Sequence, residues 1–416
     1  MNPSIPDPFW QVSADDPMAL TRILNLPDMR VAGLEYNDIS QMLHVLCAHT
    51  SSTAECPTCR RSSREVHQTK KRAVRDLPWA EWPTLLEFET RRFYCGYCHC
   101  PFREDLCWLP RCSRLTQRFR EFVFEECRRT SIQATHQKVQ LGYRTVERLY
   151  YALAQQMLLS APPPLVRKLG IDEFAIKKGH DDFALVLSDL EAGSLIAVLP
   201  DRKKETLEEY FVECTPWQRA AIEEVAMDLW EGYASAVADC LPHARIVADR
   251  FHVMKMLNDQ VSAARREIQS ALPQESKKTF KGCRWLLVRN EAELSEGDKN
   301  KLAAMLALSP DLERLHRLKE EFREILETRI DRQTAAERLT EWVHRVQASG
   351  LKKLDKFLTT LERRWEHILN YFHSRLSNGT VEGLNNKVKV IKRCAYGFGD
   401  FQHLALRLRI ECDGAP

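Results

Sequence analysis

The sequence predicts an α/β protein in which a mixed five-stranded sheet is interrupted by a large all-helical segment and preceded by two small domains. Three observations predict this. Two C-x-x-C pairs lie near the N-terminus. Three strands followed by alternating helices and strands begin after residue 165, and a long amphipathic stretch separates these elements from the C-terminal helices. The length agrees, because 416 residues exceed what one compact core usually holds.

The domain boundaries follow from changes in sequence pattern. We expect a small zinc-binding domain over residues 1–110, a helix-turn-helix domain over 111–160, a core over 161–270 and 373–416, and a helical insertion over 271–372. The Pro-rich stretch at 161–165 cannot continue a helix, since proline lacks the amide donor, and it predicts a linker.

The charges are clustered although their sum is small. The net charge is only +3, with 29% charged and 44% hydrophobic residues. The basic clusters are Arg60, Arg61, Arg64, Lys70, Lys71, Arg72 and Arg75; Arg111, Arg114, Arg118 and Arg120; and Lys387, Lys389, Lys392 and Arg393. Local charge decides where a polyanion docks, so these clusters favour nucleic acid as a partner. No apolar run of membrane-spanning length and no signal-peptide pattern is found, which predicts a cytoplasmic protein without membrane contact.

The N-terminal cysteines indicate a metal site. Fourteen cysteines without an export signal indicate a reducing compartment. The pairs Cys56-Pro-Thr-Cys59 and Cys95-Gly-Tyr-Cys98 can supply four thiolates to one tetrahedral structural zinc ion, although Cys100 could replace Cys98. Strand-like runs at 42–49 and 85–95 predict a small sheet around this site.

The next segment has the form of a helix-turn-helix. We expect a first helix from Ile132 to Val139, a tight turn at Gly142 and a second helix from Thr145. Arg144, Thr145 and Arg148 would then lie at the exposed N-terminal end of the second helix, where base edges are read in the major groove. An ordinary helix pair that touches no DNA is the alternative.

The core begins with three strands and continues with helix-linked strands. The expected strands are 169–178, 183–190, 194–200, 223–228 and 244–249. One expected helix begins at the capping-box spacing of Thr206 and Glu209 and ends near Trp217. The other expected helices are 230–241, 251–272, 380–394 and 403–410, with a turn at 395–401. Three antiparallel strands followed by parallel ones suggest a ribonuclease-H-like sheet of strand order 3-2-1-4-5.

Three carboxylates suggest a divalent-metal site in this core. Asp172 lies in an apolar strand, where an ionised carboxylate is costly without a cation, and Asp228 ends the fourth strand, next to the first. With Glu382, which begins the helix after the insertion, they could hold two Mg²⁺ (or Mn²⁺) ions for phosphoryl transfer. Asp249 could replace Asp228, or could support the site together with His252.

Polar residues follow Glu382 on the same predicted helix. Asn385, Asn386, Lys389 and Lys392 keep a spacing that leaves several of them near its helical face. They could hold a phosphate backbone beside the scissile bond, or they could form a solvated helix face.

The segments 170–193, 225–237, 244–253 and 377–401 resemble the catalytic segments of bacterial insertion-sequence transposases of the ISL-three type. The two cysteine pairs resemble that family's zinc finger, and residues 113–158 resemble its helix-turn-helix. The resemblance implies a DDE transposase with a ribonuclease-H-like core. It gives Asp172 and Glu382 the first and last triad positions, Asp228 the middle one, and Asp249 with His252 an accessory acidic–histidine motif.

The resemblance also implies partners. It predicts binding to double-stranded DNA at the terminal inverted repeats of the element and at the target, cleavage with strand transfer, a homodimer or higher oligomer, and a place at the bacterial nucleoid. Two other functions stay open from the sequence. One is a zinc and helix-turn-helix regulator with an inactive nuclease fold, and the other is a structure-selective nuclease of the resolvase type.

Overall fold

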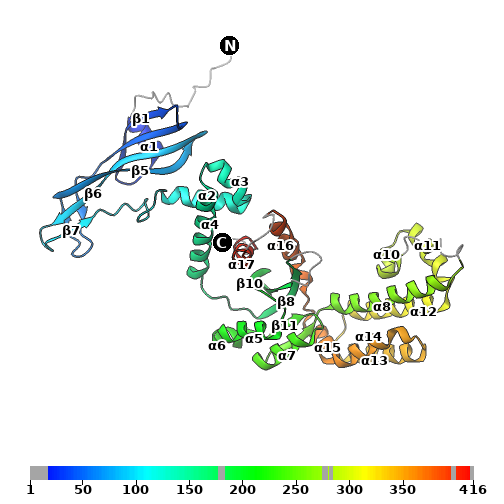
Figure 1. The fold of residues 1–416 in the computed structure, drawn as a ribbon. Coiled ribbons are helices and arrows are strands. Elements are labelled where there is room, and N and C mark those ends of the chain that lie inside the picture. The colour runs from blue at the N-terminus through cyan, green and yellow to red at the C-terminus, as the bar shows by residue number, and fades with distance from the viewer. Residues whose placement is uncertain (1–16, 177–182, 274–279, 281–283, 395–399, 413–416) are drawn as a thin grey trace, which may run out of the picture. The chain divides into compact units, whose positions relative to one another are not determined.

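The computed structural model describes residues 17–176, 183–273, 280, 284–394 and 400–412. The chain divides into two compact units, residues 1–156 and 157–416, each with its own core (Figure 1). The finer division into four domains stays a prediction. Residues 177–178 of the first expected core strand and the expected turn at 395–399 lie outside the described residues.

The N-terminal unit is built on a five-stranded sheet of order β1-β2-β6-β5, with β7 paired to β6. Its elements are α1 (Pro17–Leu24), β1 (Met29–Asn37), β2 (Met42–His49), β5 (Val66–Trp79), β6 (Trp82–Cys95) and β7 (Cys100–Arg103), with the short pair β3 (Ala54–Glu55) and β4 (Ser62–Ser63) beside it. The expected strands at 42–49 and 85–95 are confirmed. The sheet is larger than expected, since β1, β5 and β7 join them.

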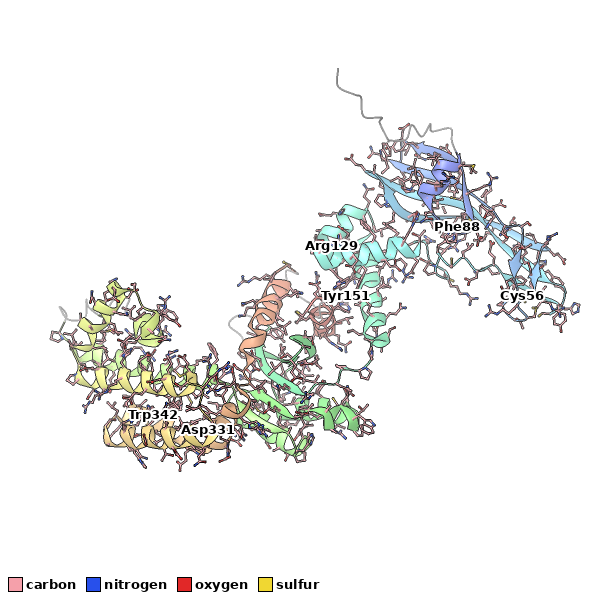
Figure 2. All side chains as sticks on the ribbon, turned by 180° about the vertical axis from the view of Figure 1, so that it is seen from behind. Cys56, Phe88, Arg129, Tyr151, Asp331 and Trp342 are labelled. Atoms are coloured by element: carbon pink, nitrogen blue, oxygen red, sulfur yellow. The ribbon has the colours of Figure 1, made fainter. Side chains whose placement is uncertain are left out.

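The long hairpin of β5 and β6 connects two small cores. At one end, Val74 and Leu86 pair across the hairpin and pack with Phe88 and Trp108 under α1. At the other end, Phe93 and the paired cysteines form a separate cluster, and Figure 2 shows Cys56 and Phe88 far apart along this sheet. The cysteine end therefore has little apolar packing of its own.

Three helices complete this unit: α2 (Gln117–Arg129), α3 (Ile132–Val139) and α4 (Tyr143–Ser160). The first expected helix, 132–139, matches α3, and Ser131 caps it by accepting from the backbone of Ala134 at 3.1 Å. The residue that reverses the chain is Gln140, in a left-handed conformation (φ 51°), and not Gly142 as expected. The second helix begins at Tyr143, two residues before the expected Thr145.

The second unit contains a mixed sheet of order β10-β9-β8-β11-β12. Its strands are β8 (Lys168–Ala175), β9 (Phe183–Asp189), β10 (Ser194–Leu199), β11 (Glu224–Met227) and β12 (Arg245–Ala248). The first three are antiparallel neighbours, and β11 and β12 run parallel to β8. The predicted strand order 3-2-1-4-5 is confirmed.

Helices cover both faces of this sheet. Ile171 and Leu187 of one face pack with residues of α5 (Lys204–Glu213) and α7 (Glu231–Cys240). Phe174 and Val186 of the other face pack with α8 (Arg250–Ala271), α16 (Glu382–Cys394) and α17 (Phe401–Cys412). Asp172 pairs with Val186 in register, so it belongs to the face covered by α16.

The prediction of one helix ending near Trp217 was wrong. Residues 206–217 form two helices, α5 and α6 (Pro216–Ala221), instead of one. Thr206 lies inside α5 and donates to Asp201 at 2.6 Å, so it does not cap the helix. The capping box is at Thr215 and Gln218, because Pro216 cannot donate a backbone hydrogen bond to the preceding helix and starts a new one.

The insertion is helical as expected. It contains α10 (Arg284–Val288), η2 (Glu291–Glu293), α11 (Glu296–Leu306), α12 (Pro310–Glu327), α13 (Arg332–Ala348), η3 (Lys352–Leu354), α14 (Asp355–Arg363) and α15 (Trp365–Ser374). Trp342 is fully buried between these helices, where its indole donates to the Leu318 carbonyl at 2.8 Å (Figure 2). A short η4 turn (Asn378–Val381) then leads into α16.

Candidate metal centre and active site

Four cysteine sulfurs meet at the end of the β5–β6 hairpin. The Sγ atoms of Cys56, Cys59, Cys95 and Cys98 all lie within 4.8 Å of one another. The loop between β3 and β4 carries the first pair, whereas Cys95 ends β6 and Cys98 lies in the loop between β6 and β7. Cys100 pairs with Cys95 in the sheet register and does not belong to this group. The geometry therefore agrees with the set that includes Cys98.

The chemistry of this group suits a cation. A backbone hydrogen bond from Cys59 lowers the pKa of the Cys56 thiol to about 6 despite its burial. The hydrogen bond with Cys59 and burial raise the pKa of the Cys98 thiol, and repulsion from the negative charge of Cys56 raises it further. A bound divalent cation would remove this repulsion, and four thiolates at tetrahedral spacing are the ligands of structural zinc. The cluster thus supports a structural Zn²⁺ ion.

The expected DNA-reading residues lie on the first turns of α4. Arg144, Thr145 and Arg148 are all exposed, whereas Val146 and Leu149 are buried against the unit's core. The helix therefore presents these three side chains outward, as a recognition helix must.

The acidic residues lie where β8 and β11 separate. The parallel pairing of these strands ends at Gly170 and Ala226. Asp172 lies on β8 two residues after Gly170, and Asp228 lies two residues after Ala226, directly beyond the end of β11. Beyond β12, Asp249 follows Ala248, the register partner of Met227, and its backbone N–H donates to the Met227 carbonyl at 2.8 Å. Three aspartates thus gather at one edge of the sheet.

Asp172 is half-buried and is held by two donors. Its Oδ1 accepts from the backbone N–H of Glu173 at 2.8 Å, and its Oδ2 accepts from the Asn385 side-chain amide at 2.6 Å. Asn385 comes from α16, so this bond joins the helix that Glu382 begins to the strand that carries Asp172. The phosphate contact expected of Asn385 stays a prediction.

Asp228 and Asp249 differ in their surroundings. Asp228 is half-buried, and its Oδ1 accepts from the backbone N–H of Trp230 at 2.8 Å. Asp249 is only 1% exposed, and its carboxylate accepts from Ser377 Oγ at 2.7 Å, from His252 Nδ1 at 3.0 Å and from the Phe251 backbone. Both Asp249 oxygens are therefore occupied by protein donors.

The charges of all three aspartates act on the ring of His252. Burial alone would lower the pKa of its ring, but the hydrogen bond to Asp249 and the charges of Asp228 and Asp172 raise it. In turn, burial would raise the pKa of the Asp249 carboxyl, but the bonds from His252 and Ser377 lower it. His252 thus lies in the field of three carboxylates, which favours its protonated ring.

The remaining expected residues lie on α16. Glu382 begins this helix, and its side chain lies outside the described part of the structure. Asn386 and Lys389 are exposed, which agrees with either a phosphate contact or a solvated face. Lys392 is half-buried and donates to the Ala175 carbonyl at the end of β8 at 2.6 Å.

Two neighbouring residues at this edge were missed by sequence reasoning. Ser377 donates to Asp249, and Asn378 donates to the Ile171 carbonyl of β8 at 3.0 Å. Their only signal was the short polar run before Glu382, which resembles an ordinary helix-capping loop.

Comparisons with known proteins agree with this arrangement. The family model for DDE transposases of the ISL3 type, described as "Transposase", matches residues 169–408. This range contains the sheet, the insertion and every carboxylate considered above. The chain belongs to the ISL3 family of insertion-sequence transposases. A second model, "zinc-finger of transposase IS204/IS1001/IS1096/IS1165", matches residues 52–98 of this transposase and ends at Cys98.

The relatives cover most of the transposase. It is 30% identical over 380 residues to the "Transposase for insertion sequence element IS1001" of Bordetella parapertussis, covering 91% of this chain and 93% of the relative. It is 25% identical over 361 residues to the "Transposase for insertion sequence element IS1557" of Mycobacterium tuberculosis (strain CDC 1551 / Oshkosh), covering 80% of each.

The transposase is therefore an enzyme that acts on DNA, and its zinc ribbon implies DNA binding. Across the described residues, none of the helices is both apolar and long enough to cross a bilayer.

Proposed function

We propose that this transposase binds the terminal inverted repeats of its insertion sequence and cuts and joins DNA at a two-metal site formed by Asp172, Asp228 and Glu382. The placement of Asp172 on β8 and of Asp228 directly beyond the end of the neighbouring strand β11 carries the proposal. The connection from Asp172 through Asn385 to α16 supports Glu382 as the third ligand, because it ties that helix to the same strand edge.

The three proposed carboxylate ligands suit Mg²⁺ or Mn²⁺. Carboxylates at a strand edge are hard oxygen ligands of the kind that Mg²⁺ and Mn²⁺ prefer. Bound ions would activate the attacking oxygen and stabilise the leaving oxygen of an in-line displacement. Asn385 orients Asp172 by donating to one of its oxygens, and a metal ion can still approach the other lone pairs of the carboxylate.

Asp249 and His252 serve as supports in this proposal. Asp249 is buried with its oxygens engaged, so Asp228, which is more exposed, is the better ligand. The hydrogen bond that His252 Nδ1 donates to Asp249 fixes the orientation of the His252 ring beside the ligands. His252 could also attract the scissile phosphate, since its raised pKa favours the cationic ring.

DNA recognition is assigned to the N-terminal unit. Arg144, Thr145 and Arg148 would read base edges, and the basic residues around the zinc cluster would contact phosphates. The strand order supports a ribonuclease-H-like core for unit two. Two element ends must be held together, so we expect a dimer or a larger assembly.

Cleavage of labelled end DNA by single-residue variants tests the proposal. Asp172→Asn, Asp228→Asn and Glu382→Gln should each abolish Mg²⁺- or Mn²⁺-dependent cleavage and leave end binding within about twofold of wild type. Asp249→Asn should reduce cleavage only partly, because it removes a support and not a ligand; losses of second-shell partners are about 10–100-fold. Cleavage at the wild-type rate in either Asp172→Asn or Glu382→Gln would overturn the proposal.

The same assay separates the other functions. A regulator with an inactive nuclease fold would bind end DNA and never nick it with either metal. A structure-selective nuclease would cut branched DNA without regard to the end sequence, and Arg148→Ala would then leave its activity unchanged.

A further inference from the structure

The η4 turn lies across the opening between β8 and β11. The ladder between these strands ends at Gly170 and Ala226, so the Ile171 carbonyl has no partner from β11. Asn378 fills this place, because its Nδ2 donates to that carbonyl at 3.0 Å. A side chain from the far end of the chain thus completes the edge of β8 one residue before Asp172.

The space for Asn378 depends on Gly170. A Cβ atom at position 170 would come within 2.8 Å of Asn378 Oδ1 and within 2.7 Å of Ser188 Oγ and Leu190 Cδ2. Asn378 is only 5% exposed, and its Oδ1 has no hydrogen-bond partner among the described atoms. A buried amide oxygen without a partner is costly, and this cost offsets part of what the bond from Asn378 Nδ2 to the Ile171 carbonyl contributes.

Ser377 provides a second attachment next to the first. It donates to Asp249 Oδ1 at 2.7 Å, directly beyond the end of β12. In the sheet order, β8 and β12 are the two neighbours of β11. Ser377 and Asn378 therefore fasten the turn to both strands that flank the Asp228 strand, and α16 starts at Glu382 four residues after Asn378.

We propose that Asn378, seated against Gly170, is a positioning residue that sets the start of α16, and hence Glu382, relative to Asp172 for divalent-metal binding. The inference rests on the proposed function, in which both carboxylates are metal ligands. Two hydrogen bonds fix the position of this short turn, and they add to the bonds from Asn385 to Asp172 and from Lys392 to Ala175 that join α16 to β8. The turn thus contributes to the precise placement that three metal ligands from separate elements require.

Direct binding of Mn²⁺ to the full-length protein on end DNA tests this inference. Asn378→Ala removes the donor to Ile171, and Gly170→Ala keeps the donor but pushes the side chain away. Each should weaken Mn²⁺ binding about tenfold or more, as losses of outer-shell partners do, and raise the Mn²⁺ concentration that gives half-maximal cleavage by the same factor. End binding without metal should not change.

Asn370→Ala is the matched control. Asn370 also donates its side-chain amide to a strand carbonyl of this sheet, Ile246 of β12, at 2.8 Å. It lies on α15, away from the η4 turn. Its loss should lower the melting temperature by an amount similar to that of Asn378→Ala and leave Mn²⁺ binding at the wild-type value.

The outcomes are separable. Mn²⁺ binding by Asn378→Ala and Gly170→Ala within twofold of Asn370→Ala would overturn the positioning role. If Asn378→Ala does not fold, Gly170→Ala alone decides the result. Wild-type Mn²⁺ binding and cleavage in Glu382→Gln would instead overturn the proposed ligand set. Weakened binding in Glu382→Gln together with normal binding in Asn378→Ala would refute only the inference drawn here.

Discussion

Replacement of Cys98 by serine should release zinc and unfold the end of the β5–β6 hairpin, whereas replacement of Cys100 should do neither. The two cysteines are close in sequence, but only Cys98 has its Sγ in the four-sulfur group. Cys100 faces its partner Cys95 across the β6–β7 hairpin instead. The two variants therefore compare an expected zinc ligand with a nearby cysteine whose sulfur lies outside the group.

Loss of zinc should unfold this end of the hairpin because few other interactions stabilise it. Apart from the cysteines, its buried cluster contains Phe93 and Phe102, and burying two such rings contributes about 3–6 kcal/mol. Ordering the segment from Ala54 to Ser63 costs roughly 10–20 kcal/mol in backbone entropy. The difference, roughly 4–17 kcal/mol, covers the apparent 10–16 kcal/mol that structural zinc sites supply. Without the metal, this region should be unfolded.

Metal analysis and limited proteolysis of the full-length protein measure both effects. Wild type and Cys100→Ser should retain one zinc ion per chain and resist cleavage between Ala54 and Ser63. Cys98→Ser should lose most of its zinc and be cut there, while the rest of the sheet stays folded around Phe88. Full zinc content with wild-type protease resistance in Cys98→Ser would refute the reasoning, and loss of zinc in Cys100→Ser would assign the fourth ligand to that residue.

Three further predictions concern stability and DNA reading. Asp76→Ala should destabilise the N-terminal unit by about 3–5 kcal/mol in urea unfolding, because Asp76 is fully buried and pairs with Arg118; a loss below about 1 kcal/mol would contradict this. Burial lowers the pKa of His316 to about 3, so the fold favours its neutral ring; the stability this contributes above pH 6.5 should fall as the pH drops toward 3, and His316→Gln should show a shallower fall than wild type in thermal unfolding. Arg148→Ala should weaken end binding by about 1–3 kcal/mol in competition with unrelated DNA, whereas the exposed Arg129→Ala on α2 should not; equal effects would argue against a reading role for α4.

The local sequence pattern was sufficient to predict an element where the pattern follows directly from burial. The runs at 183–190 and 194–200 are almost wholly apolar because both faces of their sheet are covered, and they became β9 and β10. The Ser131 cap determined where α3 begins. By contrast, β5 was missed because Val66–Lys71 is exposed on both faces and shows no alternation. It is a strand because β6 offers a long edge for pairing.

The sequence by itself determined which residues can carry chemistry here: two cysteine pairs, a helix pair with exposed arginines, and carboxylates at strand ends. These follow from spacing and from the cost of burying charge, which are local properties. Only the tertiary structure decided what each polar group contacts. In the structure, Asp249 accepts hydrogen bonds from Ser377 and His252, Asn385 donates to Asp172, and Asn378 donates to the Ile171 carbonyl. Such partners lie more than one hundred residues apart in several cases, and no sequence period reports where two distant segments meet.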